Sequence, residues 1–237
     1  MLTGPQFLTA NIAAVRKRIA AAAERAGRDP KSVTLVAVTK GQPAAVAAAA
    51  RTAGLADLAE NYLQEALPKV AAVPRQGLSW HFIGQLQANK TRPVAEQFDW
   101  VHTVDRLRLA ERLSAQRPFH GPRLNVCLQV KLEDEAAKGG VAAEEVPALA
   151  RSVAALPRLA LRGLMCVPPP DDDAAVQRGY FRRVGELAAL LRDGGLPLDV
   201  LSMGMSDDLE AAILEGATHV RIGTAIFGPR VTHAAGR

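Results

Sequence analysis

Short apolar runs alternate with longer amphipathic stretches along almost the whole chain. The runs predict β-strands at residues 34–39, 55–59, 79–84, 99–104, 123–131, 159–165, 198–202 and 218–223. The stretches between them predict helices at residues 43–53, 62–73, 88–97, 106–116, 143–156, 174–193 and 207–215, and another helix is predicted at residues 3–26. Strands that alternate with helices in this way indicate a parallel sheet covered by helices.

The number of strand–helix units favours a closed barrel. Eight such units within 237 residues fit one TIM-type barrel. The alternative is an open doubly wound sheet, which usually has fewer strands and a glycine-rich first turn, and no GxGxxG motif follows the first predicted strand. We therefore expect an α/β fold, a single (β/α)8 TIM-type barrel over residues 1–237, with an extra N-terminal helix within residues 1–30 packed on the barrel.

Composition and charge narrow the classes of protein. A hydrophobic fraction of 49% and a charged fraction of 22% are typical of a globular chain. The N-terminus lacks the pattern of a secretory signal and the apolar runs are too short for a membrane span, so we expect a cytoplasmic protein without a membrane partner. The net charge of +5 is spread among acidic residues, which argues against a nucleic-acid partner. The group Arg16, Lys17 and Arg18 is interpreted as a solvated helix face.

Lys40 is the first candidate for chemistry, because it ends a predicted strand. Active sites of TIM-type barrels lie at the C-terminal ends of the strands. An ammonium group beside an apolar barrel interior has its charged form disfavoured and becomes a better nucleophile toward an aldehyde. The alternative is a lysine that extends to solvent from a strand end.

Two segments near the end of the chain predict an anion site. The segment 202–208 offers Ser202, Gly204 and Ser206, and the segment 221–224 spans the last predicted strand and its turn. The loops after strands 7 and 8 of such barrels often bind phosphate. Simple helix capping is the alternative.

The acidic residues of the first segment limit how an anion could bind there. Asp207 and Asp208 would repel an anion, so we expect backbone N–H groups and hydroxyls to make the contacts while these carboxylates point away.

Several polar or thiol side chains fall in or beside predicted buried strands. Arg221 needs a partner there, either a ligand or a carboxylate. Asn61 and His81, taken alone, are typical of hydrogen-bonded core residues. Cys127 and Cys166 lie in apolar stretches without metal-ligand spacing and predict buried thiols rather than a metal site.

The motifs that contain these residues resemble the YggS/PROSC family of pyridoxal 5'-phosphate (PLP) homeostasis proteins over nearly the whole chain. They are AVTK ending at Lys40, ENYLQE at 60–65, WHFIGQLQANK at 80–90, HTVDRLRLA at 102–110, LRGLM at 161–165 and SMGMSDDLEAAILEGATHVRIGTAIFG at 202–228. Two departures are Ala59, where the family usually has glycine, and Cys166 after LRGLM.

The resemblance implies a monomeric barrel related to the N-terminal domain of alanine racemase, with PLP held as an internal aldimine on Lys40. It also implies phosphate contacts from Ser202, Ser206, Gly223 and Thr224, with Arg221 and Asn61 near the cofactor. With Gly204 added from the predicted anion site, the expected cofactor-binding residues are Lys40, Asn61, Ser202, Gly204, Ser206, Arg221, Gly223 and Thr224.

The chemistry implied by the resemblance favours a carrier over an enzyme. An arginine facing the pyridine nitrogen, as in alanine racemase, weakens the ring as an electron sink. A racemase also needs a second acid or base, which in alanine racemase is a tyrosine from an additional β domain and a partner subunit, whereas the chain ends just after the predicted barrel. Tyr62 and Tyr180 are the two tyrosines here, and packing in helices explains both.

We therefore expect no catalytic residue and predict a protein of intracellular PLP (vitamin B6) and amino-acid homeostasis, with apo forms of PLP-dependent enzymes as candidate partners. A PLP-dependent amino-acid racemase is the alternative, and a binding module on an inactive barrel is a third class.

Overall fold

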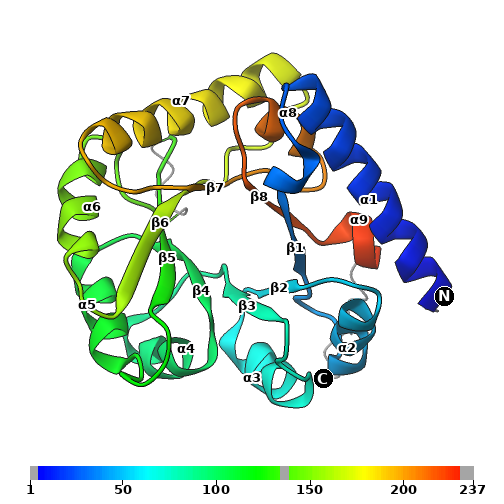
Figure 1. Cartoon of the computed structure of the whole chain (residues 1–237), viewed down its shortest axis with the longest axis horizontal. Coiled ribbons are helices and arrows are strands. Elements are labelled where there is room, and N and C mark those ends of the chain that lie inside the picture. Colours follow the sequence, from blue (N-terminus) through cyan, green and yellow to red (C-terminus); the bar gives the residue numbers. More distant parts are fainter. Residues whose placement is uncertain (1–4, 134–138, 230–237) are drawn as a thin grey trace, which may run out of the picture.

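The barrel is closed by parallel strands that follow one another in chain order. A computed structural model describes residues 5–133 and 139–229. In this part of the chain eight parallel strands close into a barrel, with β1 beside β8 (Figure 1). The strands are β1 (Thr34–Val38), β2 (Asp57–Glu60), β3 (Ser79–Phe82), β4 (Trp100–Val104), β5 (Leu124–Gln129), β6 (Leu159–Met165), β7 (Val200–Ser202) and β8 (His219–Ile222). The predicted TIM-type (β/α)8 fold is confirmed, and the doubly wound alternative is excluded.

Helices form a ring around this barrel (Figure 1). They are α2 (Ala44–Thr52), α3 (Leu63–Ala72), α4 (Thr91–Gln97), α5 (Leu107–Gln116), α6 (Val146–Ala154), α7 (Ala174–Asp193), α8 (Leu209–Leu214) and α9 (Thr224–Phe227). The long α1 (Pro5–Arg25) packs against α8 and α9, and two 3-10 helices, η1 (Pro30–Ser32) and η2 (Ala88–Lys90), complete the described elements. The main apolar core lies between the barrel wall and these helices.

The predicted bounds of two helices differ from the structure, because turns occupy residues whose sequence pattern is typical of a helix. The helix expected at 88–97 is divided into η2 and α4, and the helix expected from residue 207 begins at Leu209. The latter starts late because Asp208 Oδ1 accepts the N–H of Met205 at 2.5 Å and closes a turn. The single-domain prediction over 1–237 includes residues 1–4, 134–138 and 230–237, which lie outside the described residues.

Two further predictions on buried and apolar segments can be compared with the structure. Cys127 and Cys166 are fully buried free thiols, as expected, and burial raises the pKa of each to about 12. Among the described helices, none is both long enough and apolar enough to cross a membrane.

The barrel interior contains an unusual group of rings. His81 stacks on Trp100 with the ring centroids 5.4 Å apart, and His102 and His219 lie within 6.4 Å of His81. Burial lowers the pKa of His219 to about 4 and that of His102 well below its usual value, and the neighbouring charged groups add to the effect on His102. His102 and His219 are therefore neutral when the protein is folded at neutral pH.

The neutral histidines predict a loss of stability in mild acid. The unfolded chain binds a proton at His219 below about pH 6.5, whereas the folded chain binds it only near pH 4. The free energy of unfolding should therefore fall as the pH drops from 6.5 to 4, by up to ~1.4 kcal/mol per pH unit from this group. Denaturant unfolding across this range should give a flatter pH dependence for His219→Gln than for the wild type. The exposed His120 supplies the control, and an equal flattening in His120→Gln would contradict the assignment.

Candidate functional site

A pocket of about 290 Å³ opens at the C-terminal ends of the strands. Its lining includes six of the predicted site residues, namely Lys40, Asn61, Ser206, Arg221, Gly223 and Thr224. Apolar side chains that include Val38, Ile83, Met165, Val167 and Phe227 complete much of the wall. A concave site with a few polar groups on an apolar wall is typical of ligand pockets at this end of a barrel.

Lys40 follows β1, and the backbone on both sides of it is fixed by hydrogen bonds. The N–H of Thr39 donates to the carbonyl of Ala59 at 2.9 Å, which extends the pairing of β1 and β2. On the other side Gly41 has φ +72°, a conformation that favours glycine, and its N–H donates to Glu65 Oε2 at 2.9 Å. The half-buried Lys40 side chain therefore starts from a backbone that is held in place.

A buried ion pair also stabilises the backbone immediately before Lys40. Lys69 Nζ donates to Glu60 Oε1 and to the carbonyl of Thr39, both at 2.7 Å, and Thr39 Oγ1 donates to Glu60 Oε1 at 2.5 Å. Burial raises the pKa of Glu60, although the bonds from Lys69 and Thr39 act in the opposite direction. Sequence reasoning missed this pair. A carboxylate at the end of a buried strand was the available signal, since such a charge requires a partner.

Arg221 is a buried cation that faces the pocket. Its Nη1 donates to the carbonyl and Oγ of Ser202 at 2.6 and 2.9 Å, and its Nη2 donates to the carbonyl of Cys166 at 2.9 Å. No carboxylate of the described residues forms an ion pair with it, so the carboxylate alternative is not found in this part of the chain. Burial lowers the pKa of its guanidinium. A buried charge with only neutral partners suits a pocket that accepts an electron-rich ligand group.

Ser202 and Gly204, which were predicted to bind the cofactor, are not among the residues that line this pocket. The Ser202 side chain is fully buried inside the barrel, where its Oγ lies 2.7 Å from His102 Nδ1. Gly204 has φ +97°, and an added Cβ would lie 2.7 Å from the Cβ of Ala212. Both residues contact Arg221, because the carbonyl of Gly204 accepts the backbone N–H of Arg221 and Ser202 accepts from its guanidinium.

The rim between α8 and α9 presents donors toward the pocket. Among the described residues, the backbone N–H groups of Gly223 and Thr224 donate to no other atom. Ser206 Oγ accepts the N–H of Ala225 at 3.4 Å, which connects the two loops. Two free backbone donors beside a hydroxyl can receive a phosphate group.

The two neighbouring carboxylates behave differently from each other. Asp208 is buried and accepts the N–H of Met205, as a side chain directed away from the pocket would. Asp207 is among the residues that line the pocket.

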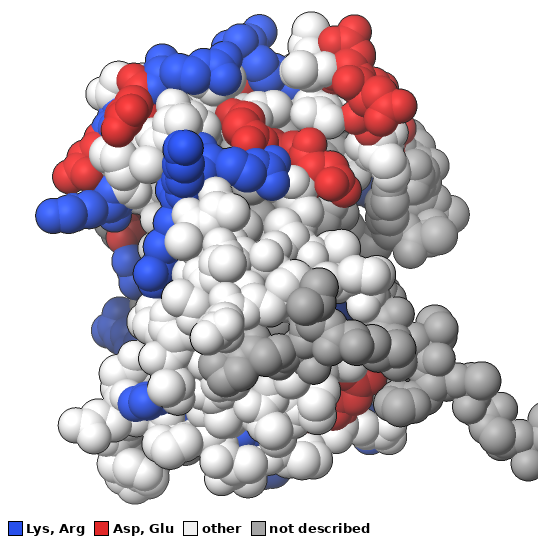
Figure 2. All heavy atoms as spheres, turned by 90° about the vertical axis from the view of Figure 1, so that its right-hand side faces the viewer, with Lys and Arg blue, Asp and Glu red and all other residues white. Residues whose placement is uncertain are grey.

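The N-terminal helix supports this rim. Arg18 donates to Glu210 at 2.7 Å and to the carbonyl of Ser206 at 2.9 Å, and Arg16 donates to the carbonyl of Gly54. Arg18 is therefore partly buried in contacts with the rim, whereas Arg16 is exposed, as the interpretation of a solvated helix face expects. On the face that carries α1, basic and acidic side chains are interspersed at one end, with no continuous basic stripe over the described residues (Figure 2).

Asn61 connects the pocket to a second hollow of about 230 Å³. Both are lined by Asn61, Ile83, Met165 and Val167, and the second also has Gln85, Thr103, Gln129 and Lys131 in its wall. Asn61 Oδ1 is buried and accepts no hydrogen bond from the described residues. Because buried polar atoms are normally paired, this oxygen is available to accept a hydrogen bond from a ligand group.

Comparisons with known proteins agree with this geometry. The sequence pattern of the alanine racemase N-terminal domain matches residues 10–231. The pyridoxal phosphate homeostasis protein of Pseudomonas aeruginosa is 60% identical over 93% of this chain and 94% of its own length. The protein of the same name from Escherichia coli is 50% identical over 93% of this chain and 95% of its own length.

Solved structures give the same result. PipY of Synechococcus elongatus, whose structure has PLP bound, is 37% identical with a TM-score of 0.81 and covers 93% of this chain and 100% of its own. Alanine racemase of Corynebacterium glutamicum shares the fold, with a TM-score of 0.72 at 16% identity, and this chain covers 63% of that enzyme. The chain therefore belongs to the family of pyridoxal phosphate homeostasis proteins, which has the barrel fold of the alanine racemase N-terminal domain.

Proposed function

We propose that this chain binds PLP covalently through Lys40 and acts as a carrier in PLP and amino-acid homeostasis without turnover of its own. The observation that carries the proposal is a single pocket lined by a lysine amine and by a buried arginine that has no ion-pair partner among the described residues. The 37% identity to PipY, whose structure has PLP bound, supports the same ligand.

The residues present fit this cofactor. The amine of Lys40 can attack the aldehyde carbon, and the free N–H groups of Gly223 and Thr224 can receive the phosphate together with the Ser206 hydroxyl. Arg221 can donate to the ring nitrogen, and Asn61 provides the buried amide. When bound, PLP supplies an aldehyde that joins an amine as a C=N bond with loss of water. Hydrolysis of that bond, or its exchange with a second amine that expels the lysine amine, would release Lys40.

Arg221 limits what chemistry the site can support. A guanidinium next to the ring nitrogen disfavours protonation of that nitrogen, because the nitrogen would become a second positive charge. An unprotonated ring withdraws electrons weakly and stabilises a carbanion poorly. The position of Arg221 in the pocket lining therefore favours holding the cofactor over reactions at Cα of an amino acid.

The tyrosines do not supply a second base to the pocket. Tyr62 is 57% exposed and lines a different hollow, beside Lys90. Tyr180 lies on α7 and donates its hydroxyl to Glu133. Neither belongs to the pocket that contains Lys40. No observation on these residues favours the racemase alternative over the carrier.

The site is also suited to releasing PLP. Lys40 is only half-buried, and the adjoining hollow leaves room for an incoming amine next to Asn61. We propose that apo forms of PLP-dependent enzymes, or free amino acids, accept the cofactor. We place this function in the cytoplasm, where the free thiols Cys127 and Cys166 stay reduced. We propose a monomer, as the resemblance of the sequence motifs to the YggS/PROSC family implies.

The carrier and racemase functions are separated by hydrogen exchange at Cα. The PLP-loaded protein is incubated in deuterated water with a panel of L- and D-amino acids, and exchange is followed by NMR. In parallel, the loaded protein is mixed with an apo-enzyme whose activity reports PLP transfer. We expect reactivation of the apo-enzyme and no exchange above one equivalent of protein. Many equivalents of exchange in the wild type, absent in Lys40→Ala, would show a catalyst and overturn the carrier proposal.

A further inference from the structure

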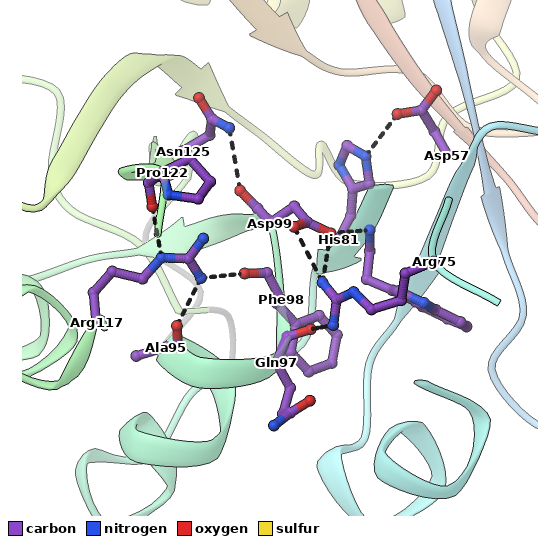
Figure 3. A network of polar contacts seen from close by, with 11 residues as sticks. Asp57, Arg75, His81, Ala95, Gln97, Phe98, Asp99, Arg117, Pro122 and Asn125 are labelled. Atoms are coloured by element: carbon purple, nitrogen blue, oxygen red, sulfur yellow. Dashed lines mark hydrogen bonds and ion pairs between the residues drawn. The ribbon is translucent and has the colours of Figure 1, made fainter. Parts of the chain in front are cut away.

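A line of hydrogen-bonded side chains crosses the barrel interior to Arg221. Asp57 Oδ1 lies 3.0 Å from His81 Nε2, and His81 Nδ1 lies 2.9 Å from His102 Nε2. His102 Nδ1 lies 2.7 Å from Ser202 Oγ, which accepts from Arg221 Nη1 at 2.9 Å. Asp57 lies at the start of β2 and forms one end of this line of side chains. Figure 3 shows the His81 ring directed toward the Asp57 carboxylate. The line therefore joins the N-terminal end of the barrel to the floor of the pocket.

When each histidine ring carries one proton, the direction of every bond follows from Asp57, whose carboxylate can only accept. Ser202 accepts from Arg221 and can donate its single hydroxyl proton to His102 Nδ1. His102 then carries its proton on Nε2 and donates to His81 Nδ1, so that His81 carries its proton on Nε2 and donates to Asp57. Both histidines are neutral in this arrangement, and the four bonds are all satisfied with one tautomer of each ring.

The charges at the two ends favour this direction. A carboxylate at Asp57 can only accept and a guanidinium at Arg221 can only donate, so the bonds of the line are polarised in the same sense. If Asp57 lost its charge, His81 could carry its proton on Nδ1 instead of Nε2 and donate it to His102 Nε2. His102 would then donate to Ser202, and the serine hydroxyl proton would have to leave this bond. The charge of Asp57 therefore sets the hydrogen bond that Ser202 makes beside Arg221.

Other titratable groups around His81 come from three further strands. His102 belongs to β4 and His219 to β8, at centroid distances of 5.1 and 6.4 Å from His81. Arg162 of β6 lies 5.0 Å above the Trp100 ring and is paired with Asp199. Asp57 is the one carboxylate among the described residues that bonds to the histidines, which makes Asp199 a suitable control at the same end.

We propose that Asp57, His81 and His102 form a relay of positioning residues that holds Ser202 and Arg221 in the geometry that the PLP ring nitrogen requires. The electronic state of the cofactor is then set partly from the opposite end of the barrel, by a carboxylate that does not line the pocket. The inference rests on the proposed function for the placement of the ring nitrogen. The tautomers themselves are a property of the chain without PLP.

The first test is a long-range ¹H–¹⁵N correlation spectrum of the protein without PLP, which distinguishes the two histidine tautomers. The relay predicts the Nε2–H tautomer for both His81 and His102 in the wild type. In Asp57→Asn it predicts a changed tautomer population, whereas Asp199→Asn should leave both rings as they are. An Nδ1–H tautomer of His102 in the wild type would overturn the relay, whatever the protein does with PLP.

The second test uses PLP labelled with ¹⁵N in its ring. We expect the ring-nitrogen resonance to shift in Asp57→Asn and His102→Leu, with PLP affinity lowered about tenfold, as loss of one charge-assisted hydrogen bond implies. His102→Gln, whose amide can accept from Ser202 and donate to His81, should restore most of the affinity.

Each outcome of the second test separates the relay from the cofactor proposal. Wild-type affinity and an unchanged resonance in Asp57→Asn would overturn the relay while leaving the cofactor proposal intact. Absence of labelled PLP from the wild type would overturn the cofactor proposal. If His102→Leu does not fold, the partly exposed Asp57 still gives a decisive variant.

Discussion

Replacement of Lys40 by alanine is expected to abolish covalent attachment of PLP, from about one equivalent per chain to none. The reason is chemical, because only a neutral amine can form the C=N bond with the aldehyde. The amount of covalently attached PLP is measured by borohydride reduction of the loaded protein followed by peptide mass mapping. The wild type should show the modification on the peptide that contains Lys40. The control is Lys31→Ala, which removes an exposed lysine and should be modified as the wild type is. An unchanged equivalent of bound PLP in Lys40→Ala would contradict the assignment.

The loss should be complete because no other lysine of the described residues lines this pocket. Lys69, which contacts the residue before Lys40, is 4% exposed and already donates to Glu60 and to the carbonyl of Thr39. Removing one partner of that buried pair would leave an unpaired charge, which is strongly destabilising. Lys69 therefore holds the turn before Lys40 and is not free to replace it.

Gly84→Ala is expected to lower the free energy of unfolding by about 3 kcal/mol and to weaken PLP binding at the same time. An added Cβ at Gly84 would lie 1.8 Å from the backbone oxygen of Asn61 and 2.6 Å from its carbonyl carbon. The backbone of Asn61 must therefore move, and Asn61 is part of the pocket lining. Denaturant unfolding and a PLP titration measure the two effects.

Gly179→Ala is the matched control. Gly179 lies inside α7, and an added Cβ there meets no atom within 4 Å. Alanine should stabilise this helix by ~0.5–1 kcal/mol, because glycine loses more conformational freedom on folding. The clash at Asn61 would be refuted if Gly84→Ala were as stable as Gly179→Ala and bound PLP as the wild type does.

Much of the fold could be predicted from the sequence because the strands are apolar runs with clear ends. The strand predicted at 159–165 and the helix predicted at 174–193 match β6 and α7 to the residue. Asp173 caps α7 by accepting the N–H of Ala175, and Gly194 follows its last turn. The helix α9 was not predicted, because four residues are too few to show a helical period.

The candidate site could be predicted only where a residue's place in the fold follows from its own strand. Lys40 and Arg221 were found because each occupies or follows a predicted strand end. The contacts beneath the pocket join residues far apart in sequence, such as His102 and Ser202, which are separated by 100 positions. Their proximity depends on how the barrel closes. For this reason His81 was recognised as a hydrogen-bonded core residue without its partners.

A crystal structure of the protein with PLP is the most direct test of the central claim, that the pocket at the C-terminal end of the barrel holds PLP on Lys40. We predict continuous density from Lys40 Nζ to the cofactor, with the phosphate at Ser206, Gly223 and Thr224 and the ring nitrogen beside Arg221. Density for PLP bonded to another lysine, or an empty pocket at saturating PLP, would contradict it.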